Sequence, residues 1–252
     1  MDAQAFQRAC MDLEREGRAG AGIGTLGEKT LHSLLKRAIE PDVSCHEVPV
    51  GRYVADVRNE RGFFEVQTRD LYRLPKKVEA FLQEAPVQVV YPIMRTTELI
   101  YLDPETGTLS EKRKSPKKGS FYKALADLYG LRSLFFRPGF SIEIVLLDGE
   151  EIRLLDGYGG DKKKHATRYE RIPTAFIDSC LLEKPEDFWT FFPQNELEAP
   201  FDIKTLGKVM GLKQREDYRA AAALRTAGVL EVVGKRGRSL LLAPAEEKSP
   251  GK

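Results

Sequence analysis

The chain of 252 residues lacks long apolar runs, closely spaced cysteines and an excess of charge of one sign. No stretch approaches about 18 consecutive apolar residues, which excludes a helix that spans a membrane. Residues 1–17 alternate charged with single apolar residues, a pattern that is not that of a signal peptide. Cys10, Cys45 and Cys180 are far apart and in no C-x-x-C spacing, which argues against disulfides and a structural zinc site. We therefore expect a cytoplasmic protein without a membrane partner.

Hydrophobic residues make up 42% of the chain and charged residues 31%, so the chain can bury a core without disulfides. The net charge of +2 is small, and any nucleic-acid surface has to come from local basic patches. Two basic runs are present, at residues 112–118 and 162–165. Each run is either a solvated loop or a surface that neutralises backbone phosphates through Lys112, Arg113, Lys114, Lys117, Lys118, Lys162, Lys163 and Lys164.

The spacing of apolar residues predicts an α/β fold with a mixed central sheet flanked by helices. Helices are expected over residues 2–17, 26–39, 74–83 and 120–129, and strands over residues 46–50, 52–58, 63–68, 87–93, 98–102, 142–147 and 151–155. Pro185, Pro193 and Pro200 indicate a linker after this part. The predicted organisation is therefore a first domain over 1–190, a linker over 191–200, a second domain over 201–243 and a disordered tail over 244–252.

The second domain has its own pattern. Residues 203–210 and 214–227 predict two helices, and residues 229–233 and 238–242 predict two strands joined by a tight turn at 234–237. This order, with a basic tip, is that of a winged helix-turn-helix. Nine Lys and Arg against four Asp and Glu give residues 200–243 a net charge of +5. The expected role is binding to duplex DNA, and contact with another protein is the alternative; the DNA-contacting residues are then Gln214, Arg215, Arg219, Lys235 and Arg236.

Two acidic residues are predicted to face each other across a hairpin. Pairing Arg58 with Phe63 places Asp56 directly opposite Glu65. Because side chains alternate along a strand, Asp56, Glu65 and Gln67 share one face of the sheet. Directly opposed like charges destabilise a sheet, and a divalent cation held by the carboxylate oxygens removes that repulsion. The alternative is that both acids face solvent on an exposed sheet.

Glu28 lies on the apolar face of the helix expected over 26–39, three residues before Leu31. It is either a capping residue favoured by the helix dipole or a third carboxylate aimed at the sheet. His32, His46 and His165 are scattered along the chain with no Ser or Cys partner. His46 precedes the hairpin, and we expect it to be a structural histidine; the alternative is that it approaches the acids.

These elements together resemble the PD-(D/E)xK nuclease core, which many restriction endonucleases and archaeal-type Holliday junction resolvases share. The resemblance covers roughly residues 20–95 and rests on Glu28 in a helix, Asp56 in Tyr53-Val-Ala-Asp56, and Glu65 and Gln67 in the hairpin. It implies a restriction endonuclease-like core in which Asp56 and Glu65 hold Mg²⁺ or Mn²⁺ and Glu28 assists. The sequence departs from the family pattern at one position, because Gln67 stands where a lysine is usual and offers only a neutral hydrogen bond.

The sequence thus leads to two hypotheses. The first is a Mg²⁺-dependent DNA endonuclease, in which the cation activates a water, Gln67 orients that water, and the winged helix delivers the enzyme to duplex DNA. The second is a non-enzymatic DNA-binding regulator whose nuclease-like domain is inactive. RNA is a further substrate class that nothing in the sequence excludes, and a homodimer is compatible with the first hypothesis because duplex cutters frequently dimerise.

Overall fold

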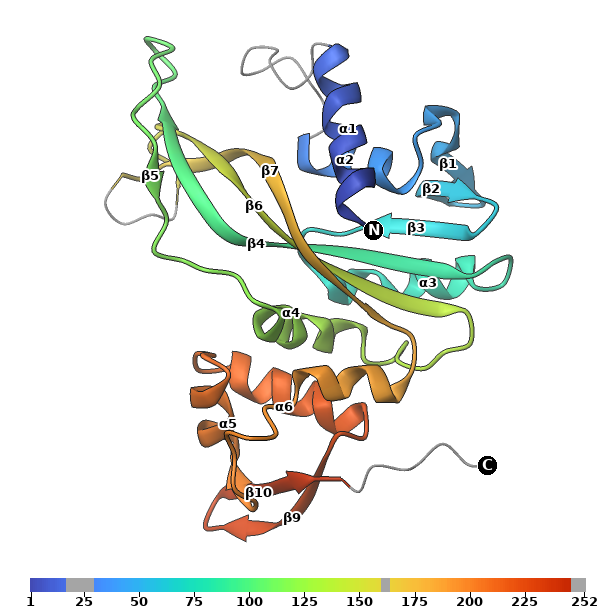
Figure 1. Cartoon of the computed structure of the whole chain (residues 1–252), viewed down its shortest axis with the longest axis vertical. Helices are drawn as coiled ribbons and strands as arrows, with labels where there is room; N and C mark the ends of the chain where they lie inside the picture. Colours follow the sequence, from blue (N-terminus) through green and yellow to red (C-terminus); the bar gives the residue numbers. More distant parts are fainter. Residues whose placement is uncertain (17–29, 160–163, 246–252) are drawn as a thin grey trace.

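Seven strands form one mixed sheet in the computed structural model, which describes residues 1–16, 30–159 and 164–245 (Figure 1). Their order is β1-β2-β3-β4-β6-β7, with β5 paired to β4 beyond the end of β3. Strand β4 is parallel to β3 and β6, and the other pairs are antiparallel. The strands are β1 (His46–Val50), β2 (Tyr53–Asn59), β3 (Gly62–Val66), β4 (Val87–Leu102), β5 (Arg113–Lys114), β6 (Phe140–Leu154) and β7 (Thr167–Leu182). The predicted α/β class with a mixed sheet is confirmed.

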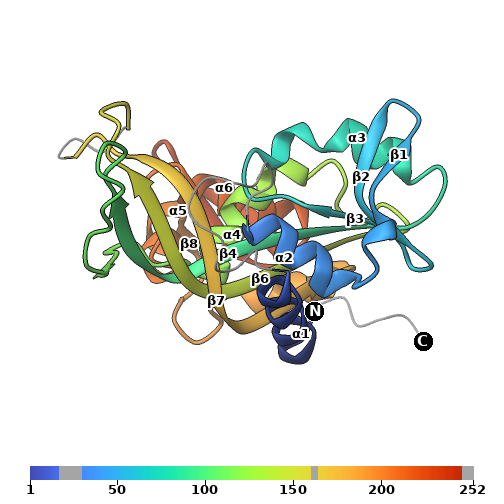
Figure 2. The same ribbon diagram turned by 90° about the horizontal axis from the view of Figure 1, so that it is seen from above.

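Helices cover both faces of the central part of this sheet. α1 (Ala3–Arg15) and α2 (Thr30–Ile39) lie across one face, as the view from above shows (Figure 2). α3 (Pro75–Phe81) and α4 (Phe121–Leu128) cover the other face. Along β4, Val89 packs toward α3 and α4, whereas its neighbour Val90 packs toward α1 and α2. The period of two in a continuously apolar strand therefore buries both faces, as residues 87–93 predicted. No helix in the described ranges is both long and apolar enough to cross a membrane.

Strands β4 and β6 are much longer than predicted, and together with β7 they extend past the helices. The strands expected over 87–93 and 98–102 are one bent strand, with an irregularity between Met94 and Thr96. Those expected over 142–147 and 151–155 are likewise one strand, and β7 was not predicted at all. The outer halves of these strands, with β5, form what we call the distal sheet (residues 96–102, 113–114, 149–154 and 167–172). It projects beyond α2 in Figure 1.

The C-terminal part forms a three-stranded sheet with two helices. Its elements are β8 (Phe201–Asp202), α5 (Ile203–Val209), α6 (Glu216–Thr226), β9 (Leu230–Arg236) and β10 (Ser239–Pro244), in the sheet order β8-β10-β9. The turn predicted over 234–237 is wrong: Arg236 pairs with Ser239, so the turn is Gly237-Arg238, and Lys235 and Arg236 lie within β9. Gln214 and Arg215 precede α6 instead of lying in it.

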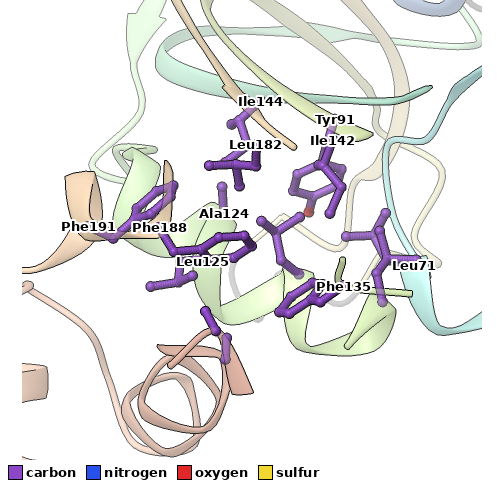
Figure 3. Packing of buried hydrophobic residues seen from close by; sticks show 14 of the residues in the cluster. Leu71, Tyr91, Ala124, Leu125, Phe135, Ile142, Ile144, Leu182, Phe188 and Phe191 are labelled. Carbon is purple, nitrogen blue, oxygen red and sulfur yellow. The ribbon is translucent and has the colours of Figure 1, made fainter. Parts of the chain in front are cut away.

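The two parts share one hydrophobic core. α4 contacts the central sheet on one side and α6 on the other, and the small Ala220, Ala221 and Ala223 of α6 are all buried. Leu125 of α4, which is fully buried, lies at the centre of the cluster together with Phe188 and Phe191 (Figure 3). The last two residues belong to a 3-10 helix, Pro185–Phe191, one of four that also include Val43–Cys45, Leu71–Arg73 and Tyr129–Leu131 in the described ranges. The start of the segment predicted as a linker is thus buried in the core.

Gly62 begins β3 against the backbone of Pro86, the residue before β4, and its replacement tests that packing. Its φ is +121°, and a Cβ atom there would lie 2.2 Å from the carbonyl oxygen of Pro86, which accepts the N–H of Phe63 (2.8 Å). We expect Gly62→Ala to lower the free energy of unfolding by about 3 kcal/mol or more, from backbone strain and overlap together. Gly51→Ala is the matched control, because Gly51 also has a positive φ (+57°) but open space around it. It is expected to cost only about 1 kcal/mol. Urea unfolding of both variants measures the difference, and equal losses would contradict this account.

Candidate functional site

A cavity of about 660 Å³ opens at the carboxyl end of β3, between α2 and α3. In open α/β sheets, ligands bind outside the carboxyl ends of the strands. The lining of the cavity is rich in charged residues, namely Glu47, Asp56, Glu65, Glu170, Arg69, Lys77, Arg168 and Arg171, and it also includes His32 and Gln67. The predicted residues Asp56, Glu65 and Gln67 therefore do share one site.

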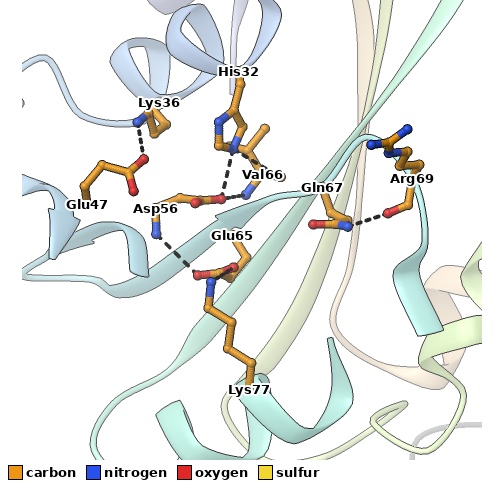
Figure 4. A network of polar contacts seen from close by, with 9 residues as sticks. All are labelled: His32, Lys36, Glu47, Asp56, Glu65, Val66, Gln67, Arg69 and Lys77. Atoms are coloured by element: carbon orange, nitrogen blue, oxygen red, sulfur yellow. Dashed lines mark hydrogen bonds and ion pairs between the residues drawn. The ribbon is translucent and has the colours of Figure 1, made fainter. Parts of the chain in front are cut away.

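The β2–β3 register predicted from the sequence is confirmed. Val57 pairs with Phe64 and Arg58 with Phe63, so Asp56 and Glu65 come at the same level of the two strands. There the strands open, and each carboxylate binds the backbone of the other strand. The N–H of Asp56 donates to Glu65 Oε1 (3.3 Å), and the N–H of Val66 donates to Asp56 Oδ2 (2.7 Å) (Figure 4). The two acids thus stand where regular ladder hydrogen bonds would be, at the edge of the cavity.

A third acid, Glu47 of β1, extends this row. His46 pairs with Val57 and Val48 with Ala55, so Glu47 comes at the level of Asp56 on the other side of β2. Its φ is +51°, a left-handed conformation that costs a residue other than glycine about 1–3 kcal/mol. Such strain is concentrated at functional sites. Glu47, Asp56 and Glu65 therefore form a row across β1, β2 and β3, which we call the carboxylate row.

Two lysines and a histidine from two helices face the carboxylate row. His32 and Lys36, one turn apart on α2, lie on one side of it: His32 Nε2 is 3.1 Å from Asp56 Oδ2, and Lys36 Nζ donates to Glu47 Oε1 (2.6 Å). Lys77 of α3 approaches from the other side and donates to Glu65 Oε2 (2.5 Å), as Figure 4 shows. His32 was not assigned to any site, and Lys36, Lys77 and Glu47 were not predicted. His32 and Lys36 are spaced i, i+4 in the predicted helix, and this spacing was the signal that could have placed both side chains on one face.

The atoms that could hold a metal ion differ from those predicted. One ligand atom each of His32, Glu47 and Asp56 lie within 4.8 Å of one another. Of the three predicted ligands, Asp56 belongs to this group, Glu65 is bound by Lys77 instead, and Glu28 lies outside the described residues. Among the described residues, the group whose ligand atoms lie together is thus one imidazole and two carboxylates.

Gln67 lines the cavity but does not point its amide at the carboxylate row. Its Nε2 donates to the carbonyl oxygen of Arg69, and its backbone N–H donates to the carbonyl oxygen of Val90 (3.0 Å). The amide therefore fixes the loop that follows β3. In this arrangement the ammonium group next to Glu65 is that of Lys77, which comes from α3 and not from the third position of the strand motif.

Glu65 is the most perturbed acid of the site. Only 2% of Glu65 is exposed. Its burial, and to a smaller extent the charge of Asp56, raise its pKa to about 7, although the charge of Lys77 lowers it. A carboxyl group of this pKa exchanges its proton near neutral pH, which is what a general base requires.

The predicted DNA-binding residues lie in separate places. Arg113 and Lys117 line a second cavity in the distal sheet, and the nearby Lys164 lies over the ring of Tyr101. Lys112 forms an ion pair with Glu150. Lys114 and Lys118 are exposed, and Lys162 and Lys163 lie outside the described residues. The C-terminal candidates lie around α6 and β9, where Arg219 is 3.7 Å from Asp127 of α4.

The pKa of Glu65 predicts a pH dependence of stability. The unfolded carboxyl group ionises near pH 4.5 and the folded one near pH 7, so between these values the folded protein holds the extra proton. Rising pH then favours the unfolded state, and the free energy of unfolding is expected to fall by about 3 kcal/mol from pH 4.5 to 7 through this group. In Glu65→Gln, which keeps the shape but not the titration, this part of the fall should be absent. Urea unfolding at several pH values, in buffer that contains a chelator, measures the free energy of unfolding of both proteins. Identical pH profiles of wild type and Glu65→Gln would contradict the assignment.

Comparisons with known proteins place the chain in a family without assigning an activity. Residues 29–183 match the model of a domain of unknown function, DUF8091, and this segment includes the whole described cavity lining. An uncharacterized protein of Treponema pallidum (strain Nichols) is 34% identical over 162 residues, which are 64% of this chain and 61% of that protein, so the match spans less than two thirds of the relative. No solved structure matches. Because the family model covers more than half of its length, the chain belongs to the DUF8091 family.

Proposed function

We propose that this protein is a divalent-metal-dependent nuclease that hydrolyses phosphodiester bonds of DNA. The observation that carries the proposal is the carboxylate row next to His32, in a cavity that also holds Arg168 and Arg171. Carboxylates placed together serve to bind a cation, and arginines beside them serve to bind an anion. A phosphodiester is an anion whose hydrolysis a divalent cation promotes. The sequence resemblance to the PD-(D/E)xK core, and a restriction endonuclease-like fold of residues 20–95, belong to the same proposal.

The residues present fit a divalent cation. The donor atoms of His32, Glu47 and Asp56 lie within 4.8 Å of one another, a spread that metal–ligand distances of about 2.0–2.6 Å can bridge. One imidazole with two carboxylates suits Mn²⁺ as well as Mg²⁺, because imidazole favours transition metals. When bound, the ion supplies Lewis acidity and a water of lowered pKa.

The remaining residues have separate tasks in this proposal. Glu65, whose pKa of about 7 lies near neutral pH, accepts a proton from the attacking water. Lys77 holds the Glu65 carboxylate at the cavity and contributes positive charge there, the role that Gln67 does not fill. Arg168 and Arg171 bind the phosphate oxygens of the substrate, because guanidinium groups pair with phosphate in a bidentate manner.

The C-terminal part is proposed to be a winged helix-turn-helix that binds duplex DNA. The order β8-α5-α6-β9-β10 supports this reading, with α6 as the second helix and the β9–β10 hairpin as the wing. Tyr218 and Arg225 of α6 are exposed and line a cavity of about 430 Å³ together with Lys204, Arg219 and Arg238. This cationic hollow between helix and hairpin is suited to a phosphate backbone.

A DNA-binding regulator with an inactive nuclease-like domain is the second candidate. The observation that favours it is Gln67, whose amide is turned to the carbonyl oxygen of Arg69. In this alternative, Lys36 and Lys77 neutralise the carboxylate row permanently, and the row is a structural ion-pair network.

Plasmid cleavage separates the two candidates. We expect wild-type protein with Mn²⁺ or Mg²⁺ to nick supercoiled DNA, and Asp56→Asn to do so at least about a hundredfold more slowly, because the ion's contribution is worth several kcal/mol. Lys77→Met should also be impaired. Glu60→Gln, which removes an exposed acid in the turn of the same hairpin, is the matched control and should cut normally.

Mn²⁺ titration calorimetry and thermal unfolding of each variant accompany the cleavage assay, because Asp56 also binds the backbone of Val66. Unimpaired cutting by a folded Asp56→Asn protein would contradict the site assignment. If wild type binds DNA but cuts nothing with either ion, the regulator is favoured.

The wing makes a prediction of its own. Lys235→Ala with Arg236→Ala should weaken binding to duplex DNA and reduce the slope of log K against log salt by about 1.8, the value for two lost phosphate contacts. Arg8→Ala with Lys76→Ala removes two exposed cations of α1 and α3 and is the matched control. Fluorescence anisotropy at several salt concentrations measures both, and an equal change of slope in the two double variants would argue against the wing as a DNA contact.

A further inference from the structure

The distal sheet contains a second cavity, of about 590 Å³, that the proposed catalytic site does not use. Four cations line it, Arg113 and Lys117 from the basic run after β4, Arg153 from β6 and Arg168 from β7. None of the described residues that line it is acidic. Its volume is that of a small-molecule pocket, so it can take individual nucleotide units but not a base-paired duplex.

Arg168 connects this distal cavity to the candidate catalytic cavity, because it lines both. It belongs to a cluster of three arginines organised by Glu151, which is 5% exposed. Arg153 lies 2.7 Å, Arg168 2.8 Å and Arg171 3.3 Å from the Glu151 carboxylate. A buried carboxylate that holds three guanidinium groups fixes their positions before any ligand arrives.

The electrostatics of this cluster favour an anionic ligand. Burial raises the pKa of Glu151, but the charges of Arg168, Arg153 and Arg171 outweigh burial and hold it below its usual range. For Arg168, burial and the charge of Arg171 lower the pKa, and the attraction of Glu151 does not fully offset them. Arg168 and Arg171 share a single carboxylate, so a phosphate group at the junction of the two cavities would relieve their mutual repulsion.

Aromatic side chains complete the distal cavity. Tyr101 lines its wall, with Lys164 Nζ 3.8 Å from the ring centroid. Tyr158 lies at the rim and is 89% exposed, which is unusual for a large aromatic residue. Tyr101 itself is buried, so the ring open to a base is that of Tyr158. A cationic groove with an exposed aromatic ring is the common design of single-strand binding surfaces, since a base can stack on the ring.

We propose that the two cavities form one path for a single strand of nucleic acid, which runs from the carboxylate row past Arg168 into the distal cavity. Arg113 and Lys117 bind its phosphates, and Tyr158 stacks on a base. The assignment of the path to a nuclease substrate rests on the proposed function, whereas binding of the strand itself does not. The substrate is then a strand that is unpaired next to the scissile bond.

The test measures how a fluorescein-labelled oligothymidine of about 20 nucleotides binds to the full chain in EDTA. Fluorescence anisotropy reports the binding at several salt concentrations. Arg113→Gln with Lys117→Gln should reduce the slope of log K against log salt by about 1.4, the value for two phosphate contacts on a single strand. Tyr158→Ala should weaken binding at least about fivefold, the effect of one lost stacking contact.

Matched controls come from exposed positions away from both cavities. Arg8→Gln with Lys76→Gln removes the same charge from positions that line neither cavity, and Tyr72→Ala removes another exposed tyrosine. Both controls should leave the single-strand affinity within about twofold of wild type. A blunt duplex serves as the competing probe, and its affinity should not depend on Arg113, Lys117 or Tyr158.

Each other outcome overturns the proposal. It is wrong if wild type does not bind the oligothymidine, if the cavity variants behave like their controls, or if they weaken duplex and single-strand binding alike. Failure of the nuclease proposal looks different: the variants then change single-strand binding as expected, but wild type cuts no DNA with Mn²⁺ or Mg²⁺. If the cavity variants still cut DNA and bind the oligothymidine as wild type does, the nuclease proposal stands and the single-strand path is wrong.

Discussion

Holding three carboxylates at one level of three neighbouring strands has an electrostatic cost, and the candidate site depends on the positive groups that offset it. Glu65 is buried, and the loss of hydration for such a charge costs several kcal/mol unless a partner offsets it. The partners come from both faces of the sheet: Lys36 and His32 from α2, and Lys77 from α3. The carboxylate row can therefore exist only in a sheet covered by helices on both sides, and the layered fold is a condition of the site.

The unequal lengths of the strands determine where this site opens. β3 ends at Val66, whereas its parallel neighbour β4 continues to Leu102. The carboxyl end of β3 thus leaves part of the β4 edge uncovered before β5 begins, and the cavity forms there, below α2. Because β6 and β7 continue alongside β4, the same sheet that carries the carboxylate row also carries the arginines at its border. One continuous sheet in this way positions both the carboxylates and the arginines of the cavity.

The sequence predicted the local part of this arrangement and missed the long-range part. The short β2–β3 turn fixed the level of Asp56 and Glu65 correctly, because register follows from turn length. The same reasoning about the two-residue turn at Gly51 would have placed Glu47 opposite Asp56. β7 was missed because Pro173 interrupts its pattern; a proline is compatible with a strand at the edge of a sheet, which is where β7 lies. Lys77 could not be found, because its approach to Glu65 depends on how α3 packs under the sheet.

Position 67 illustrates why a linear motif decides less than it suggests. Read along the strand, glutamine in place of lysine removes a positive charge from the site and argues for lost catalysis. In space, an ammonium group stands 2.5 Å from Glu65 all the same, supplied by Lys77. A phosphate or an attacking water responds to the position of a charge and not to the element that carries it, since Coulomb energy depends on distance and medium. The identity of residue 67 is therefore a weaker argument for the inactive regulator than the orientation of its amide, and the contribution of Lys77 becomes the sharper distinction between the two candidate functions.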